Sequence, residues 1–204
     1  MILEGIVTTL SSDGLLNIAP MGPSVDPQPG FEFARFVLRP FRTSVTYRNL
    51  KERGEGVLHV TDDVLLLAQT AIGVAVDPLP ETRPADSVLG RILVNACRYY
   101  EFRVQSIDDR EERTTITVES VAQGRLRDFF GFNRAKHAVI EAAILATRVG
   151  LIPPPKILEE FHKLQILVEK TGGPAEHAAI ALLRQFVQNA AASASPANAE
   201  SSSP

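Results

Sequence analysis

The segment from residue 39 to residue 53 concentrates side chains that can bind an anion. Five of its side chains are cationic, against the single acid Glu52. Hydroxyl side chains stand within it at Thr43, Ser44 and Thr46, where a capping signal predicts the start of a short helix. The free N–H groups of a helix start, together with hydroxyl and guanidinium groups, form a phosphate site without a glycine-rich loop. The same pattern also fits a capped, solvated helix, and both interpretations stay open at this point.

Other patterns of catalytic or metal-binding residues are weak or missing. The sequence has no glycine-rich dinucleotide motif, no P-loop and no nucleophile elbow, and its four histidines are dispersed. His137 and Glu141 stand one helical turn apart and suit acid–base or metal chemistry, but a surface pair is the simpler interpretation. Cys97, among apolar residues, is expected in the core. We therefore assign no catalytic residue and no metal ligand.

The composition narrows the class of protein. Of the 204 residues, 45% are hydrophobic and 22% charged, and the formal net charge is −3, which is the balance of an ordinary globular protein. Slight acidity argues against a general nucleic-acid binder. No apolar run approaches the roughly 18 residues that cross a bilayer, and the first residues lack a basic leader. With one cysteine in addition, we expect a cytoplasmic protein that binds neither nucleic acid nor membranes.

The elements expected around the basic segment are mostly strands. Asp13-Gly14 predicts a hairpin over residues 3–19, and a proline-rich loop is expected over 20–30. A strand over 31–39 leads into the capped helix, which Gly54 ends. Further expected elements are strands over 56–61, 91–107 and 114–122 and a helix over 62–72. Short helices scattered among strands favour an antiparallel barrel over a doubly wound sheet.

The second part of the chain is expected to be helical. Apolar residues at helical spacing predict three short-linked amphipathic helices, the first capped by Asn133. These helices cover residues 133–149, 156–171 and 174–189. Small residues dominate the last stretch of the chain, which predicts a disordered tail. The expected domains are a barrel over 1–126, a helical extension over 127–189 and a tail over 190–204.

Several segments resemble a known family. They are NIAPMGP at 17–23, FVLRP at 36–40, TSVTYRNL at 43–50, GVLHVT at 56–61, GFNRAKHAVIEAA at 131–143 and VEKTGG at 168–173. Together they resemble the flavin reductase-like FMN-binding split barrels. The last two are similar to the C-terminal extension of an uncharacterised prokaryotic subfamily of unknown function. The resemblance covers about residues 1–189 and implies an α+β, mainly β fold, an antiparallel split barrel with a C-terminal three-helix extension.

The resemblance implies that FMN lies at a homodimer interface, with its ring against the backbone after the second strand and its phosphate near the hydroxyl-rich helix start. The ring residues would be Asn17, Ala19, Pro20 and Met21. The phosphate ligands would be Thr43 and Thr46, helped by Arg39, Ser44 and Asn49. Pro40-Phe41-Arg42 departs from the shorter polar connection of relatives. The extension would cover the flavin, add a substrate wall with Asn133, Arg134 and His137, or enlarge the dimer interface.

Three functions fit these observations. The first is an FMN-dependent, flavin reductase-like oxidoreductase of unknown substrate, with NADH or NADPH as the candidate electron donor. The flavin would carry the hydride, so no side chain need act as acid or base. The second is a non-catalytic flavin-binding or carrier protein, since a fold alone delivers no reaction. The third is a protein with a vestigial flavin site whose helices bind a partner.

Overall fold

A computed structural model describes residues 1–26 and 33–194 of the chain. Its residues divide into two compact units. We call the first the barrel unit, which comprises Met1–Asp63 and Val76–Phe130, and the second the helical unit, which comprises Val64–Ala75 and Gly131–Pro204. The helix over 64–71, which the sequence places among the strands of the first 126 residues, thus belongs to the helical unit.

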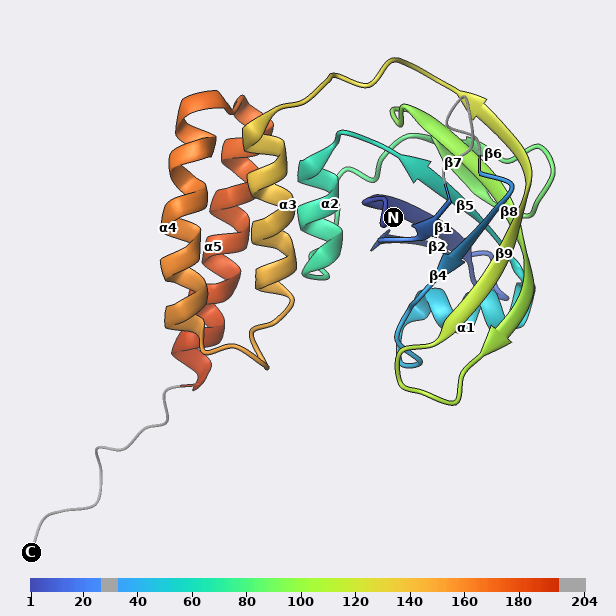
Figure 1. Ribbon diagram of the computed structural model, residues 1–204, viewed down its shortest axis with the longest axis horizontal. Coiled ribbons are helices and arrows are strands. Elements are labelled where there is room, and N and C mark those ends of the chain that lie inside the picture. Colours follow the sequence, from blue (N-terminus) through green and yellow to red (C-terminus); the bar gives the residue numbers. More distant parts are fainter. Residues whose placement is uncertain (27–32, 195–204) are drawn as a thin grey trace, which may run out of the picture. The chain divides into compact units, whose positions relative to one another are not determined.

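The barrel unit is built on a curled antiparallel sheet of seven strands (Figure 1). The strands are β1 Gly5–Leu10, β2 Leu16–Met21, β3 Ser24–Val25, β4 Arg35–Leu38, β5 Glu55–Val60, β8 Arg98–Asp108 and β9 Thr115–Arg125. They follow the order β2-β1-β5-β8-β9-β4-β3. Ile2, just before β1, forms a bridge with Ser24 of β3, and Leu3 donates to the carbonyl of Pro23. The last strand of the order is therefore tied back to the chain before β1, and the sheet closes toward a barrel.

The predicted hairpin is confirmed, but its second strand is longer than expected. β1 and β2 pair from Gly5↔Met21 to Leu10↔Leu16. Pro20 was expected in a loop, whereas it lies within β2 opposite Ile6. β2 is an edge strand, where the missing N–H of a proline removes no ladder hydrogen bond. Residues 27–30 of the predicted loop lie outside the described residues.

The predicted strand over 91–107 is wrong in one respect, because the chain turns within it. β7 Arg91–Leu93 pairs with β6 Thr82–Pro84 in a separate two-stranded sheet. The N–H of Ala96 then bonds back to the carbonyl of Leu93, and the N–H of Cys97 bonds to Val60 of β5. β8 begins only afterwards. The turn contains apolar residues, so hydrophobic pattern alone could not reveal it.

The predicted helix over the basic segment is confirmed as α1, Val45–Arg53. Ser44 caps its start, and Gly54 ends it in the left-handed conformation at φ 69°, which a side chain would disfavour. One face of α1 packs on the barrel core through Tyr47 and Leu50. The other core side chains of this cluster include Val7, Phe36, Leu38, Leu58, Tyr100, Phe102, Ile116 and Val118.

The described residues of the helical unit form four helices (Figure 1). They are α2 Val64–Ala71, α3 Arg134–Ala146, α4 Pro154–Thr171 and α5 Pro174–Ala194. The buried face of α3 is almost all alanine, so that neighbouring helices approach it closely. α5 continues through residues 190–194, which were expected to start the disordered tail, and residues 195–204 lie outside the described residues. None of the helices described is both long and apolar enough to cross a membrane.

His59 is a fully buried polar residue that joins three strands of the barrel unit. Its Nδ1 lies 3.2 Å from the carbonyl oxygen of Ile6 in β1, and its Nε2 accepts from the N–H of Leu93 in β7 at 3.0 Å. An N–H group can only donate, so Nε2 is the acceptor and the neutral ring carries its proton on Nδ1. Burial lowers the pKa of His59 to about 4, against the smaller raising effect of its bond to Ile6.

We predict that acid destabilises the protein through His59. The native ring takes up a proton only near pH 4, whereas the unfolded chain does so near pH 6.5. The free energy of unfolding should therefore decrease as the pH falls from 6.5 to 4, by at most about 3.4 kcal/mol. Denaturant unfolding of His59→Gln should show a flatter dependence on pH than the wild type. His162→Gln, which removes an exposed histidine, serves as the control; equal pH slopes for His59→Gln and the wild type would contradict this assignment.

Candidate functional site

The predicted anion site lies at the first turn of α1. Ser44 uses its hydroxyl as the cap and accepts from the N–H of Tyr47 at 3.1 Å. The N–H groups of Val45 and Thr46 have no acceptor among the residues that the structure describes. Two backbone donors at the positive end of the helix therefore remain for an anion. Thr43, which precedes the cap, is exposed beside them.

Thr46 belongs to a polar cluster that joins β1, β2 and α1. Asn17 of β2 donates through Nδ2 to the hydroxyl oxygens of Thr46, at 3.1 Å, and Thr9, at 3.2 Å. Asn49 donates to Thr9 at 3.0 Å. Thr9, Thr46 and Asn49 are almost fully buried. We call these four residues the Thr–Asn cluster. Because Thr46 accepts from Asn17, its own hydroxyl hydrogen can still be donated.

The five basic side chains of residues 39–53 have different environments. Three of them have partners inside the barrel unit: Arg48 donates to the carbonyl of Thr43, Lys51 pairs with Asp109, and Arg53 donates to the carbonyls of Ser11 and Ser12. Arg39 and Arg42 are exposed, and their guanidinium groups have no hydrogen-bond partner within residues 1–26 and 33–194. These two charges are the ones that remain for an anion beside α1.

Asp109, at the tip between β8 and β9, neutralises part of the basic segment. It accepts from Lys51 at 2.7 Å and from the hydroxyl of Tyr47 at 2.6 Å. These bonds, that of Lys51 first, lower the pKa of Asp109 to about 2. The carboxylate is therefore anionic at neutral pH and holds α1 to the hairpin tip, and sequence spacing offers no signal for this contact.

The connection Pro40-Phe41-Arg42 is fixed against the start of β9. The N–H of Arg42 donates to the carbonyl of Glu112 at 2.9 Å, and Thr114 donates to the carbonyl of Pro40 through its N–H and its hydroxyl. The guanidinium of Arg113 lies over the ring of Phe41, 5.2 Å from its centroid. This insertion therefore leads into α1 along a defined path.

The edge strand β2 carries the residues expected along a flavin ring. Asn17, Ala19, Pro20 and Met21 are all half-buried. β2 is the first strand in the sheet order, so its outer backbone edge has no neighbouring strand within the described part of the chain. An unpaired edge offers N–H and C=O groups to a ligand with amide-like edges. The edge strand, the Thr–Asn cluster and the start of α1 together suit a ligand that has a planar polar ring and a phosphate.

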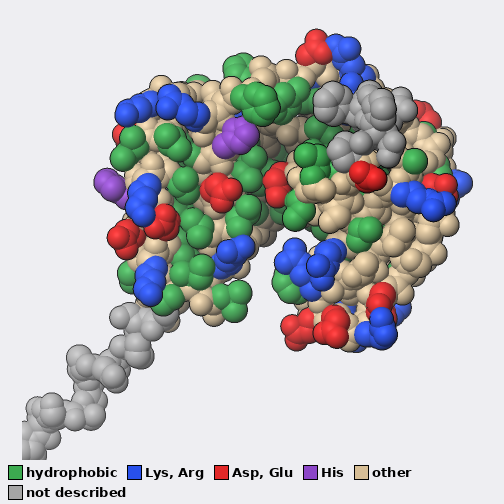
Figure 2. All heavy atoms as spheres, in the orientation of Figure 1, with side chains coloured by type: hydrophobic (Ala, Val, Ile, Leu, Met, Phe, Trp, Pro, Cys, Tyr) green, Lys and Arg blue, Asp and Glu red, His purple; other side chains and the backbone are tan. Residues whose placement is uncertain are grey.

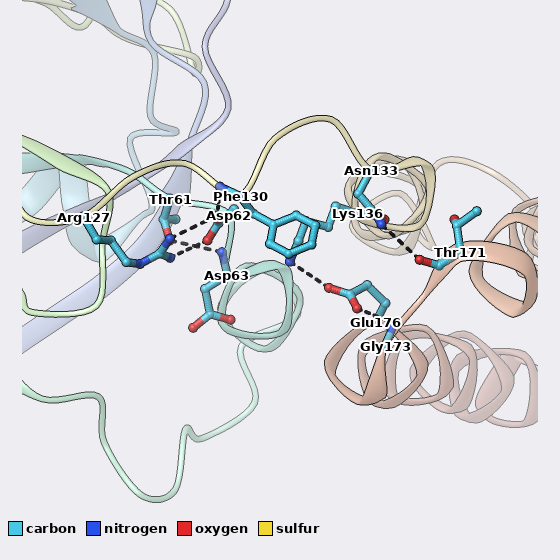
Figure 3. A network of polar contacts seen from close by, with 10 residues as sticks. All are labelled: Thr61, Asp62, Asp63, Arg127, Phe130, Asn133, Lys136, Thr171, Gly173 and Glu176. Atoms are coloured by element: carbon cyan, nitrogen blue, oxygen red, sulfur yellow. Dashed lines mark hydrogen bonds and ion pairs between the residues drawn. The ribbon is translucent and has the colours of Figure 1, made fainter.

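Asn133, which was expected on the substrate side, caps a helix and joins two helices. Its side-chain oxygen caps α3 by accepting from the N–H of Lys136 at 3.0 Å, and its Nδ2 donates to the carbonyl of Thr171 at 3.0 Å (Figure 3). Nearby, Lys136 pairs with Glu176 at 2.8 Å, and Glu176 also accepts from the N–H of Gly173. The amide of Asn133 is thus occupied in joining α3 to the end of α4.

Arg134 and His137 lie at a pocket of the helical unit. Its volume is about 310 Å³. The lining residues are Phe132, Asn133, Arg134, His137, Ala138, Glu141, Leu164 and Leu167. The structure therefore brings the three expected substrate-side residues around one cavity. The sequence did not indicate the contribution of Phe132 or of the α4 leucines, because no local pattern relates α3 to α4.

Asp62, at the start of the helix expected over 62–72, is a buried carboxylate that joins two segments of the barrel unit. Asp62 accepts from both terminal nitrogens of Arg127 and from the N–H of Phe130, the latter at 2.7 Å (Figure 3). These contacts hold the chain after β9 against the chain after β5. Cys97 is buried close by, and burial raises the pKa of its thiol. The expected core position of Cys97 is confirmed.

Charge is mixed over the surface. Figure 2 shows acidic and basic side chains interspersed on the visible face of each unit.

Two models of one protein family match this chain. A family model described as protein of unknown function (DUF447), N-terminal domain, matches residues 3–127, and one described as protein of unknown function (DUF447) matches residues 133–185. No curated protein matches the sequence.

Solved structures share the fold. The FMN-bound protein MM1853 from Methanosarcina mazei is 23% identical with a TM-score of 0.75, and the match covers 91% of this chain and 94% of that one. A flavoredoxin from Methanosarcina acetivorans is 12% identical in sequence to this chain and superposes with a TM-score of 0.50. That match covers 61% of this chain and 68% of the flavoredoxin. These similarities confirm the expected fold, a flavin reductase-like split barrel with a C-terminal helical extension.

We predict that Asn133 contributes to stability and not to ligand binding. Asn133→Ala removes a helix cap and the bond to Thr171, which should lower the free energy of unfolding by about 1 to 3 kcal/mol. Arg134→Ala, at an exposed neighbouring position, should change it by less than about 0.5 kcal/mol. Denaturant unfolding of both variants checks this, and equal stabilities would refute the capping role.

Proposed function

Because the chain belongs to the DUF447 family and shares its fold with an FMN-bound protein of that family, we propose that it binds FMN. The observation that carries the proposal is the first turn of α1. Its two open N–H groups lie beside a hydroxyl that the Thr–Asn cluster fixes to the edge strand β2. A ligand that combines a phosphate with a hydrogen-bonding ring matches both parts.

The phosphate is assigned to the start of α1. Thr43 and Thr46 supply hydroxyl donors, and the N–H groups of the first turn supply the rest. The exposed guanidinium of Arg39 provides charge. Ser44 and Asn49 were expected as helpers; both side chains already hold local structure, so they support the site by positioning it.

The ring is assigned to β2. Ala19, Pro20 and Met21 offer half-buried side chains along the edge strand, and Asn17 orients the strand through the Thr–Asn cluster. The resemblance that implies FMN also implies a homodimer with the flavin near the subunit interface, and the homodimer is part of the same proposal.

The favoured activity is that of an oxidoreductase. FMN, when bound, supplies hydride and electron transfer at its N5 position. The protein then has to bind and orient the group and exclude water, which agrees with the lack of an assigned acid–base pair. NADH or NADPH is proposed as the electron donor, with the oxidised substrate unassigned. A flavin carrier without turnover is the second candidate, distinguished below.

We predict that Thr46→Val weakens FMN binding. Loss of a hydrogen bond to a charged group should cost on the order of 1.5 to 3 kcal/mol, roughly a ten- to 150-fold rise in Kd. Fluorescence titration of the flavin-free protein with FMN measures it. Thr115→Val, which changes an exposed threonine at the start of β9, is the control. A Kd equal to that of wild type would remove Thr46 from the site, and failure of the wild type to take up FMN would reject flavin binding.

We predict that a nicotinamide nucleotide reduces the FMN-loaded protein. Under anaerobic conditions NADH or NADPH should bleach the flavin absorbance faster than it bleaches the same amount of free FMN, because the protein holds donor and acceptor together. Stopped-flow absorbance measures the two rates. Absence of bleaching by both nucleotides, with FMN still bound, would contradict the proposed donors and favour the carrier function.

A further inference from the structure

The pocket of the helical unit has an almost entirely apolar surface, although several of the residues that line it are ionisable. Leu164 and Leu167 of α4 and Ala138 of α3 form the apolar part of its lining. Arg134, His137 and Glu141 of α3 also line it. We call this cavity of about 310 Å³ the α3 pocket. Its volume suits a small molecule with one or two rings.

The three ionisable residues of the α3 pocket are free to meet a ligand. Arg134, His137 and Glu141 are spaced by three and four positions, so they lie on one face of α3. All three are exposed, and none has a side-chain hydrogen bond or ion pair in the described part of the chain. By contrast, Asn133 and Lys136 of the same helix start are fully engaged in holding the helices.

An aromatic ring stands at the mouth of the α3 pocket. Phe132 is 95% exposed, and its ring centroid lies 6.0 Å from that of His137 at an interplanar angle of 34°. Gly131, just before Phe132, adopts a positive φ of 110°, a backbone conformation that would be strained for a residue with a side chain. Covering a phenylalanine that is exposed to this extent with a second apolar or aromatic surface is favourable, because apolar area is removed from water.

We propose that the α3 pocket binds a small aromatic carboxylate that carries a hydrogen-bond donor on the far side of its ring. The carboxylate meets Arg134, at the N-terminal end of α3. The ring lies against Phe132 and His137 above the leucines of α4. The carboxylate of Glu141 accepts the hydrogen bond from the ligand's donor group. This inference does not rest on the proposed FMN site.

The spacing along α3 fits a ligand of this length. Arg134 and Glu141 are seven residues apart, which places their Cα atoms about 10 Å apart along the helix. One substituted ring with a hydrogen bond of about 2.9 Å at each end spans a similar distance. The opposite charges of Arg134 and Glu141 also orient the ligand, because a carboxylate near Glu141 is repelled.

The test is a titration of the isotope-labelled full-length protein with 4-aminobenzoate, followed by backbone amide signals. We expect saturable shifts of Ala138, Leu164 and Leu167. Arg134→Ala should weaken binding at least about tenfold, whereas Arg148→Ala, an exposed arginine outside the pocket, should leave it unchanged. Glu141→Ala should abolish the preference for 4-aminobenzoate over benzoate. Aniline, which lacks the carboxylate, should bind more weakly.

Three outcomes would overturn the proposal: no saturable shift of these amides at millimolar 4-aminobenzoate, equal weakening by Arg134→Ala and Arg148→Ala, or equal binding of aniline and 4-aminobenzoate. FMN content is measured on the same samples. Unchanged FMN content in Arg134→Ala separates the α3 pocket from the flavin site. Binding of 4-aminobenzoate by a wild-type protein that takes up no FMN would reject flavin binding alone.

Discussion

The candidate flavin site depends on the hydrogen bonds that the side-chain amide of Asn17 donates. This amide donates to Thr9 and Thr46 and so joins the edge strand to the first turn of α1. A buried polar group left without a partner costs about 1 to 3 kcal/mol, so this cluster tolerates few other arrangements of the two elements. The strand and the helix start therefore keep a fixed separation, which a rigid ligand with two recognition points requires.

The helical unit uses a second asparagine in a similar way and leaves other residues free. Asn133 and Lys136 bond to neighbouring helix ends and hold α3 in place. Arg134 and His137, adjacent in sequence to those two, lie on the exposed side of the helix. One short motif thus serves two purposes, since helical periodicity separates its residues onto different faces. Within the part of the chain that the structure describes, rigid support thus stands beside ionisable side chains that have no hydrogen-bond or ion-pair partner, as the proposed pocket requires.

The features that could be predicted from sequence are those set by neighbours along the chain. Capping and Gly54 define α1 locally, so the helix followed from residue types. The contact between Asn17 and Thr46 spans 29 positions and has no local signature. The turn inside residues 91–107 could not be predicted because its residues are apolar, like those of a strand. The position of Pro20 within a strand could not be predicted either, because only the order of strands in the sheet shows that β2 is an edge strand. The α3 pocket could not be predicted from local sequence, because it forms only where α3 and α4 pack together.

Pro20 within the edge strand also bears on behaviour at high protein concentration. An unpaired strand edge is a template on which another chain can add a strand, and this is a common first step toward aggregation. A proline there has no N–H to offer, so that such an added strand loses a hydrogen bond at this point. The edge thus stays open to a small ligand while resisting intermolecular sheet extension.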